Sequence, residues 1–477
     1  MNLIIFPNNL YEKTYLPQNI SRVFLIEDPI FFGYRETKMK FNKLKLVLHR
    51  SSMKYYYNYL TKKKIRVTYI ELKQLKNLKY DFVKKEKLKN IFVFELNDHL
   101  LKERLPFEYK TLPNPNFLLS IELLQIYYKK KQSFYHQDFY KFVKTNILET
   151  KKQQITFAKS MDSENRKKIK KTQTLPTNYR AKDNKYKIEA RIYVNEHFNK
   201  NYGNVKNTWF PVTHKEAKAC LTHFINHKLK NFGTYQDAIL QDNGFLYHSC
   251  ISSSMNIGLL NPDYVLRKIL EVTHKFKINN IEGFIRQILG WREYQRYCYL
   301  FCYNEMKNSN YFGNNKQLSS KWYSAKTKIR PVDDAIKFAF EYGYLHHIVR
   351  LMVICNFMNL CRIKTHECFK WFMEFSIDSY PVFMIQNVYS MGLYSDGGFT
   401  MRKPYLSSSN YILNLSDYKK TESWVFTWKC LFYYFLERKQ KKIENTVYNR
   451  NLVYFKKLDV NEQKTRKKIA KTFLNNI

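Results

Sequence analysis

The stretch Glu282-Gly-Phe-Ile-Arg-Gln-Ile-Leu-Gly-Trp-Arg-Glu-Tyr294 says most about the fold of this chain. Its apolar residues recur at the spacing of a helix packed on a core, at Phe284, Ile285, Ile288 and Leu289. Gln287, Trp291 and Glu293 surround that stripe, so polar and aromatic groups meet beside a buried surface. A large ring next to a guanidinium suits stacking on a flat heteroaromatic ligand and pairing with its phosphate. Taken alone, the pattern is more typical of a core helix that carries surface charges.

The composition is that of a large and strongly basic protein. Its 477 residues suffice for two or three domains with sizeable cores. The chain carries 82 basic and 40 acidic residues, a formal net charge of +42, and lysine runs recur along its length. This charge favours a polyanionic partner, nucleic acid first and an anionic membrane second. Compositional drift toward Lys, Asn, Ile, Tyr and Phe is the alternative explanation, and the two can coexist.

The eight cysteines show neither a secreted disulfide framework nor a zinc motif. They are Cys220, Cys250, Cys298, Cys302, Cys355, Cys361, Cys368 and Cys430. Cys298 and Cys302, at i and i+4, could clip a metal, but buried free thiols in a reducing compartment fit the scatter better.

Two apolar stretches are candidates for an export signal or a membrane span. Met1–Phe6 is too short for a signal peptide and lacks a basic region before it. Trp424–Leu436 contains Lys429 and is too short to span a bilayer. We therefore expect a soluble intracellular protein, in the cytoplasm or, in a eukaryote, the nucleus.

The first 125 residues alternate strand-like and helical patterns. Four short apolar runs rich in β-branched and aromatic residues predict strands, at Leu3–Phe6, Val23–Ile26, Val67–Ile70 and Ile91–Phe94. A helical pattern over residues 44–62 separates the second and third, so we expect an α/β, Rossmann-like domain with a parallel sheet. No GxGxxG is present. A ligand of this domain would lie at the carboxyl ends of the strands, near Pro7–Leu10 and Glu27–Pro29.

A basic connector and a large helical domain are expected to follow. Residues 126–190 look like a linker, and Arg166–Lys171 within it is either a solvated loop or a nucleic-acid-facing surface. From residue 191 to 477 the periodicity predicts an all-α domain, with helices near 215–229, 264–275, 281–305, 333–360 and 366–375.

Several segments, in this order, resemble one family. They are Phe232-Gly-Thr-Tyr-Gln-Asp-Ala238, His248-Ser-Cys-Ile-Ser-Ser-Ser-Met-Asn-Ile-Gly258, Gly283–Glu293, Gly343-Tyr-Leu-His-His-Ile-Val-Arg-Leu-Met352, Asn387-Val-Tyr-Ser-Met-Gly-Leu-Tyr-Ser-Asp-Gly-Gly398 and Lys403-Pro-Tyr405. Upstream, Lys43–Met53, Leu112–Phe117, Met161–Lys167 and Phe210–Thr213 fit as well. The series resembles the photolyase/cryptochrome family, and within it the photolyase-related branch of bacterial iron–sulfur cryptochromes and prokaryotic (6-4) photolyases. The resemblance covers nearly the whole chain.

The resemblance implies that the helical domain binds FAD. His248, Ser249, Ile251 and Ser252 are similar to the turn that holds the FAD diphosphate, where hydroxyls and amides at a helix start satisfy an anion; alone, such a turn is usually a plain N-cap. Arg350 matches the family's cation beside the flavin ring. Further pocket residues are implied at Tyr235, Gln287, Arg292, Asn387 and Asp396.

The resemblance also implies catalytic roles for Trp291 and for the pair His346-His347. Trp291 and Arg292 correspond to the junction of lesion and flavin, where Trp can stack on an extruded base and Arg can reach a phosphate. Adjacent histidines on a helix point in different directions, so both are unlikely to bind one metal, and one core and one partly exposed His is the plainer interpretation. In the family context one of them faces the lesion, and a (6-4) lesion needs a proton as well as an electron.

The chain departs from the family at the iron–sulfur cluster, which four cysteines hold in relatives. Pro331 takes the place of the first cysteine, and Ser416-Asp-Tyr418 is followed by Lys419-Lys-Thr-Glu-Ser423 instead of a CxxC. Only Cys430 can match, so no iron–sulfur cluster is expected, and aromatic packing after Ser423 is expected to replace it.

Two other family features are weakened. In the tryptophan electron relay, Tyr323 and Val382 stand where relatives have Trp, so photoreduction is expected to be slow or rerouted. In the N-terminal domain Asn8-Asn9-Leu10 replaces Asp-Gln-Leu, which weakens the case for a lumazine-type antenna chromophore.

Together these features predict an enzyme of the photolyase type: a monomer that uses light and reduced FAD to repair pyrimidine photoproducts, in particular (6-4) lesions, in UV-damaged DNA. No membrane partner is expected. A cryptochrome-like blue-light photoreceptor and a flavin-free nucleic-acid-binding protein are the alternatives.

Overall fold

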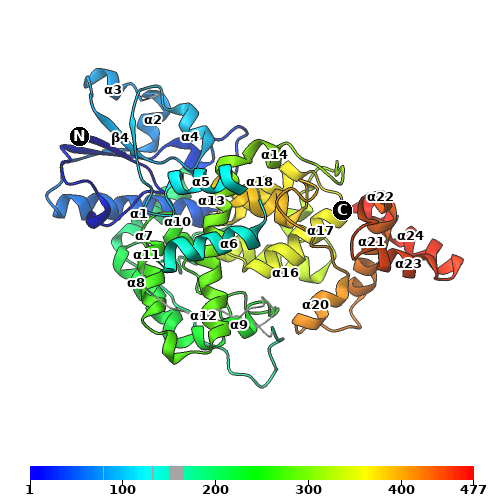
Figure 1. Ribbon diagram of the computed structural model, residues 1–477. Helices are drawn as coiled ribbons and strands as arrows, with labels where there is room; N and C mark the ends of the chain where they lie inside the picture. The colour runs from blue at the N-terminus through cyan, green and yellow to red at the C-terminus, as the bar shows by residue number, and fades with distance from the viewer. Residues whose placement is uncertain (79, 132–133, 150–165) are drawn as a thin grey trace.

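The computed structural model describes residues 1–78, 80–131, 134–149 and 166–477, and shows an α/β region joined to a large helical region (Figure 1). Residues 161–165 of the family-like segment Met161–Lys167 lie outside the described part. In the described part of the chain, every helix is too short or too polar to traverse a lipid bilayer.

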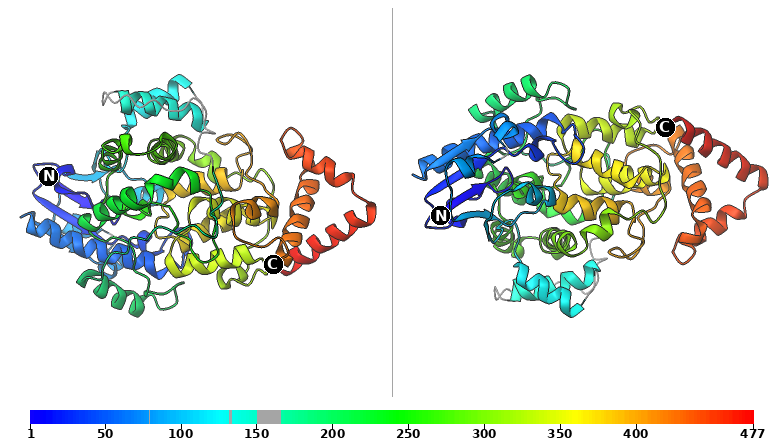
Figure 2. Two further views of the ribbon diagram at one scale, coloured as in Figure 1. Left: turned by 90° about the horizontal axis from the view of Figure 1, so that it is seen from below. Right: turned by 90° about the horizontal axis from the view of Figure 1, so that it is seen from above.

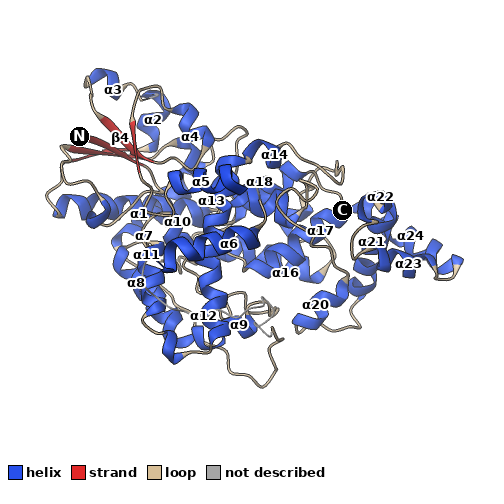
Figure 3. Ribbon diagram, viewed as in Figure 1, coloured by secondary structure: helices blue, strands red, loops and turns tan. Residues whose placement is uncertain are grey.

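The N-terminal region contains a parallel sheet with the strand order β3-β2-β1-β4-β5 (Figure 3). The strands are β1 (Asn2–Ile5), β2 (Arg22–Ile26), β3 (Val67–Ile70), β4 (Ile91–Phe94) and β5 (Lys110–Leu112). The four predicted strands are confirmed, and Ile4 of β1 pairs with Phe24 of β2 and Val93 of β4. β5 was missed because it is a three-residue edge strand without an apolar run.

Helices cover both faces of this sheet. The long helix α1 (Lys43–Lys62) lies on one face, and α2 (Leu72–Leu78), α3 (Phe82–Lys85) and α4 (His99–Arg104) lie on the other (Figure 1). α1 begins at Asn42, whose side-chain oxygen accepts the Leu44 N–H at 2.9 Å, a standard N-cap. The crossover direction reverses between β1 and β4, so the crevice at their carboxyl ends is the topological switch point of the sheet.

The region predicted as a linker is partly helical. It contains the end of α5 (Ile121–Lys131), α6 (His136–Lys144), a π-helical turn at Thr145–Glu149 and the start of α7 (Lys185–His197). The abundant lysines hid an apolar face on α6, where Phe139, Tyr140 and Val143 are buried. Arg166–Lys171 is not a free loop either, since Lys167 N–H donates to the Thr234 carbonyl at 2.8 Å and Ile169 is buried.

The helical region follows the α/β region and contains most of the helices of the chain. Its helices include α8 (His214–His227), α9 (Phe232–Tyr235), α10 (Ser252–Asn256), α11 (Pro262–Leu270), α12 (Ile278–Ile285), α13 (Glu293–Phe301), α14 (Tyr303–Lys307), α15 (Lys321–Ser324), α16 (Arg330–Tyr342), α17 (Asn356–Leu360), α18 (Thr365–Phe375) and α19 (Pro381–Met384). Phe284, Ile285, Ile288 and Leu289 are all buried, as the sequence predicts.

The predicted single helix over 333–360 is wrong in one respect, because it breaks at Gly343. α16 ends there with Gly343 at φ +63°, and a Cβ at this position would lie 2.6 Å from Cγ2 of Ile377. Only glycine meets both demands without strain. The break separates α16 from the helical segment that carries Arg350.

The C-terminal helices form an arm that extends from the rest of the molecule (Figure 2). They are α20 (Ser409–Leu415), α21 (Ser423–Arg438), α22 (Gln440–Ile443), α23 (Asn449–Lys456) and α24 (Val460–Asn476). Trp424 and Trp428 of α21 are buried, and Trp428 packs on Phe357 with ring centroids 4.6 Å apart. This aromatic packing joins the arm to the body.

Candidate functional site

A cavity of about 260 Å³ lies within the helical region, and three π-helical segments form much of its wall. These segments are Arg286–Arg292, Val349–Cys355 and Ile385–Gly392. The wider turn of a π-helix shifts side chains relative to an α-helix and is frequent at functional sites. The sequence predicted α-helices here, because the apolar spacing of a short π turn does not differ visibly from that of its flanking α turns.

The cavity contains one buried ion pair, between Arg350 and Asp378. Nη1 of Arg350 lies 3.0 Å from Oδ1 of Asp378, and Nη2 lies 3.2 Å from Oδ2. Ser252 donates to Oδ2 at 2.6 Å, and Ser376 donates to Oδ1. Burial alone would raise the pKa of Asp378, but Arg350 and the two hydroxyls together hold it below its usual value. The site therefore keeps a fixed cation and carboxylate side by side.

Arg350 was predicted for the site and lines the cavity, whereas Asp378 was missed. The signal for Asp378 was present in the sequence: it is a single acidic residue within the long apolar run from Phe375 to Met384. Its loop is held from the other domain by Lys45 of α1, whose Nζ donates to the Ser379 carbonyl at 2.7 Å.

His248 and His346 stack in the wall of the cavity, with ring centroids 4.5 Å apart and an interplanar angle of 17°. Both are buried, and burial, together with the neighbouring His347 and Arg350, lowers the pKa of His346 to about 3. Among the residues that the structure describes, Nε2 of His248, Nδ1 of His346 and Oε1 of the cavity residue Gln236 have no hydrogen-bond partner. Such buried polar atoms usually find a partner, so a ligand with polar groups suits this wall.

The two adjacent histidines have different surroundings. His346 lies in the extended turn that follows Gly343 and is 2% exposed, whereas His347 starts the next helical turn and is solvent-exposed. Both line the cavity. The expected division into one core and one exposed histidine is therefore present, although the pair is not inside a helix as the sequence suggested.

The serine-rich turn also lines the cavity, through His248, Ser249, Ile251 and Ser252. Cys250 in this turn adopts φ +56°, and α10 begins at Ser252. The Ser252 hydroxyl is already committed to Asp378. Because α10 has only five residues, its dipole is short, and the turn would contact an anion mainly through individual donors.

Trp291 lines the cavity, and one of its faces is covered. His136 of α6 stacks on it with centroids 3.8 Å apart and an interplanar angle of 15°. A Cβ on Gly290 would lie 2.9 Å from Nε2 of His136, so glycine makes this close approach of α6 possible. His136 was missed because it lies in the region interpreted as a linker.

Arg292 lines the cavity, but its guanidinium donates hydrogen bonds to other protein groups. Its Nε donates to the Asn116 carbonyl at 3.0 Å, and Nη1 donates to Oδ1 of Asn256 at 2.6 Å. The guanidinium also lies over the ring of Phe383 at 4.6 Å. Burial lowers the pKa of Arg292 to about 10. Its donors therefore tie the loop after β5 to the cavity wall.

The remaining predicted residues divide into two groups. Gln287 and Asn387 line the cavity, and Oδ1 of Asn387 accepts a hydrogen bond from Gln295 at 2.9 Å. Tyr235 and Asp396 are not among its lining residues. Tyr235 instead stacks on Tyr247 at 5.1 Å, and Asp396 accepts hydrogen bonds from Gly398 and Thr400 within its own loop.

Tyr323 lies away from the cavity, in a cluster of aromatic residues. Its ring stacks on the half-buried Tyr202 at 4.5 Å, and its hydroxyl donates to Oε2 of Glu374 at 2.7 Å. Phe340 links Tyr323 to the buried Trp371, at 5.9 and 6.0 Å respectively. Trp371 precedes Phe372, which lines the cavity, so a row of aromatic rings leads from beside the cavity to the half-buried Tyr202, with Phe340 between the oxidisable Trp371 and Tyr323.

The eight cysteines are free thiols, and their surroundings bear on the expected absence of an iron–sulfur cluster. Among the described residues, no three or more His, Cys, Asp or Glu side chains gather as metal ligands. Cys430 is buried in α21, where Trp424 and Trp428 pack at 6.0 Å and Phe357 covers Trp428. The expected aromatic packing is present, within a helix.

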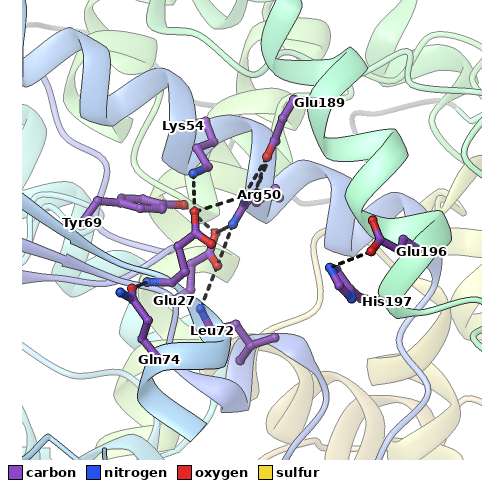
Figure 4. Close-up of polar contacts among 10 residues, drawn as sticks. Glu27, Arg50, Lys54, Tyr69, Leu72, Gln74, Glu189, Glu196 and His197 are labelled. Atoms are coloured by element: carbon purple, nitrogen blue, oxygen red, sulfur yellow. Dashed lines mark hydrogen bonds and ion pairs between the residues drawn. The ribbon is translucent and has the colours of Figure 1, made fainter. Parts of the chain in front are cut away.

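The carboxyl edge of the sheet is filled by protein groups (Figure 4). At the end of β2, Nη1 of Arg50 lies 3.1 Å from both oxygens of Glu27, and Nη2 lies 2.7 Å from Oε1 of Glu189. Tyr69 also donates to Glu27. The ligand position expected near Glu27–Pro29 is thus occupied by an internal ion network.

Polar groups at the switch point between β1 and β4 also pair with one another. Asn9 donates to the hydroxyl of the fully buried Tyr11 at 3.0 Å, and that hydroxyl donates to Asn114 at 2.7 Å. Beside it, Nε of Arg296 lies 3.0 Å from Oε1 of Glu95. Beside these paired groups, a cavity of about 510 Å³ is lined by residues that include Tyr15, Phe94 and Asn114.

Comparisons with known proteins give a consistent result. The model of the family described as deoxyribodipyrimidine photo-lyase-related protein matches residues 3–210. A (6-4) photolyase of Agrobacterium fabrum is 36% identical over 280 residues, which are 58% of this chain and 55% of that protein. The chain thus aligns with about half the length of this relative.

Solved structures share the fold at low identity. A Synechocystis cryptochrome has a TM-score of 0.58 and 16% identity, covering 97% of this chain and 93% of that one. A class III photolyase from Agrobacterium tumefaciens has a TM-score of 0.54 and 16% identity, covering 99% and 89%. The predicted fold class, an α/β domain followed by an all-α domain, is confirmed by these likenesses.

Proposed function

We propose that this chain repairs UV-induced pyrimidine photoproducts in DNA with light, because residues 3–210 match the photolyase-related family and 280 residues are 36% identical to a (6-4) photolyase. The (6-4) lesion is the first candidate substrate. The single observation that carries the proposal is the cavity lined by a fixed Arg350–Asp378 pair and by two buried imidazoles, His248 and His346, each with one nitrogen that finds no partner among the described residues.

The residues of the cavity fit FAD. Flat apolar and aromatic walls suit the ring system, and Gln236, His248 and His346 offer unpaired polar atoms to its edges. When bound and reduced, FAD supplies an electron under near-UV or blue light. Arg350 would hold the negative charge of the reduced ring, while Asp378 and Ser252 fix the position of the guanidinium.

His347 is the better proton donor of the histidine pair. Its side chain is exposed at the cavity. In the free protein, desolvation by the surrounding wall and the charges of Arg166 and Arg350 lower its pKa to about 4. A phosphate bound beside it would raise that pKa and favour the protonated form. His346 is buried beside His248 and is held neutral by its low pKa. It would donate or accept a hydrogen bond without changing its charge.

Trp291 would offer its uncovered face to the extruded base, with His136 supporting the ring from behind. Arg292 would act through Asn116 and Asn256 by holding the wall in place, so we no longer assign it a phosphate. Tyr235 and Asp396 would affect the site only through the packing of their loops.

Tyr323 would take the role of a redox-active residue that returns the cofactor to its reduced state. A buried tyrosine loses its proton when oxidised, and Oε2 of Glu374 at 2.7 Å is placed to receive it. The proposal includes no iron–sulfur cluster, which the aromatic packing of Trp424 and Trp428 in the arm supports. It does not depend on a lumazine-type antenna. A monomer in the cytoplasm or nucleus remains our expectation.

A cryptochrome-like photoreceptor is the second candidate, because the same cavity would bind the same flavin and the fold is shared with a cryptochrome. The exposed His347 favours repair, since signalling needs no proton donor at the lesion. A flavin-free nucleic-acid-binding protein is the third, and the unpaired cavity atoms argue against it.

One experiment separates these functions. Purified protein with reduced flavin is illuminated with oligonucleotides that carry a (6-4) lesion or a cyclobutane dimer. Repair of the (6-4) oligonucleotide supports the proposal, and His347→Ala should abolish it while flavin content stays unchanged. Absence of repair with intact flavin photochemistry would support the photoreceptor instead.

A further inference from the structure

We propose that α24 carries a second nucleic-acid contact, separate from the cavity. A row of three lysines, Lys464, Lys468 and Lys471, would bind the phosphate backbone of duplex DNA regardless of sequence or damage. The inference deepens the proposed function and rests on it only for the identity of the polyanion.

The row has a defined geometry. Residues at i, i+4 and i+7 lie on one side of a helix, and at 1.5 Å per residue the three lysines extend over about 10 Å. All three are exposed. Duplex DNA carries a charge for roughly every 1.7 Å of its axis, so such a row can meet several phosphates at once.

The helix that carries the row is held firmly. Its other face buries Ala470 and Leu474, and Phe473 packs on Phe357 with centroids 5.8 Å apart. At its C-terminal end, the Nζ atoms of Lys316 and Lys321 donate to the carbonyls of Leu474 and Asn476. The row therefore has a fixed position on the arm that extends from the body (Figure 2).

The positive charge of this region is largely uncompensated. Residues 438–477 contain 12 Lys and Arg against 3 Asp and Glu, whereas the whole chain has 82 against 40. The acidic groups on and against α24 are engaged: Glu462 pairs with Arg466, Glu437 pairs with Lys467 at 2.6 Å, and Asp459 caps α24, whereas Glu444 is exposed after α22. Within the described chain, no ion pair involves Lys464, Lys468 or Lys471.

The arrangement favours nucleic acid over a lipid surface. A helix that lies in a membrane interface needs an exposed apolar face beside its basic one. The apolar face of α24 is packed against the arm and the body, as the burial of Ala470 and Leu474 shows. After Val460 in its first turn, the exposed residues of α24 are charged or polar, which suits a phosphate backbone.

The test measures affinity for an undamaged duplex in the dark as a function of salt. The variant Lys464→Gln/Lys468→Gln/Lys471→Gln should lower the slope of log K against log salt by up to about 2.7, at roughly 0.9 per lost phosphate contact. The matched control is Lys84→Gln/Lys85→Gln/Lys87→Gln, which removes the same charge from the exposed lysines at and after α3, at the other end of the molecule (Figure 1). The control should keep the wild-type slope, as should the three-lysine-to-arginine variant of α24.

Three results would overturn the inference: an unchanged slope in the α24 variant, an equal decrease in both glutamine variants, or loss of binding to anionic vesicles with duplex binding intact. The outcome is separate from that of the proposed function. A protein that repairs no lesion but shows the α24-specific slope change keeps this contact and loses the repair proposal.

Discussion

The carboxyl edge of the sheet and the cavity of the helical domain both collect buried polar groups, but they satisfy them in different ways. At the edge, Arg50 is surrounded by Glu27 and Glu189, and Tyr69 completes the network (Figure 4). In the cavity, Arg350 has its carboxylate, yet the nearby imidazoles of His248 and His346 each keep an unpaired nitrogen. Buried polar groups satisfied by the protein indicate architecture, whereas unsatisfied ones beside open volume indicate a ligand.

The largest expected effect is a difference in flavin content between substitutions of Arg350 and of Arg50. Arg350→Met leaves the carboxylate of Asp378 buried without its cation, and Arg50→Met does the same to Glu27. Removing one partner of a buried pair costs about 3–5 kcal/mol. Both variants should therefore unfold at lower urea, but only Arg350→Met should lose its flavin, measured as flavin released per protein on denaturation.

Asp378→Asn should lower the stability less than Arg350→Met does, because asparagine keeps the volume and one acceptor while removing the charge. Equal flavin loss in the Arg50 and Arg350 variants would contradict the contrast between the two regions. It would mean that flavin content follows stability alone.

Lowering the pH should reduce the stability of the protein through His346. The pKa of His346 is depressed to about 3 by burial, so its neutral form contributes stability that is fully present above about 6.5 and is lost as pH falls toward 3. At pH 5 the loss is about 2 kcal/mol, from 1.36 kcal/mol per pH unit. Urea unfolding at pH 7 and pH 5 should show this loss, and His346→Gln should reduce it.

His49 provides the satisfied counterpart. Burial also lowers its pKa to about 3, but both of its nitrogens are paired, with the Phe31 carbonyl at 2.8 Å and the Tyr380 hydroxyl at 2.7 Å. His49→Gln should therefore weaken the protein already at pH 7, unlike His346→Gln. A pH dependence that is the same in His346→Gln and in the wild type would show that this imidazole is not held neutral.

A smaller effect is expected at Tyr323, outside both regions. Tyr323→Phe keeps the stacking on Tyr202 but removes the hydroxyl that donates to Glu374. Photoreduction of the flavin, followed by its absorption under blue light, should slow several-fold. Repair by chemically reduced protein should stay unchanged, because it does not need this residue; a parallel loss of repair would contradict the assignment.

The smallest effect is expected at Cys430. Cys430→Ala removes a buried thiol, at a cost of about 1 kcal/mol, and should leave the visible spectrum and the flavin content unchanged. Iron bound to the wild-type protein and released by this substitution would show that a cluster exists after all.

Much of the fold followed from local pattern. The strands β1 to β4 are short runs of β-branched and aromatic residues, and the stripe of Phe284 and Ile288 is buried as its spacing predicts. β5 and α6 were missed for the same physical reason: tertiary packing stabilises them, while their own sequences are short or lysine-rich.

The site was less predictable. Arg350, His248 and Ser252, which the motifs predict for the site, line the cavity. The contact between Asp378 and Arg350 could not be predicted, because sequence spacing does not show which loops meet. Nor can it show that the donors of Arg292 turn toward Asn116, since the partner lies 176 residues away. The π-helical turns are likewise a property of packing.

The account depends most directly on flavin in the cavity, and an absorption spectrum of the purified protein tests this. We predict flavin bands at close to one flavin per chain, lost together with the Arg350–Asp378 pair and without an iron–sulfur shoulder. A colourless protein that takes up no FAD when it is supplied would contradict the central claim.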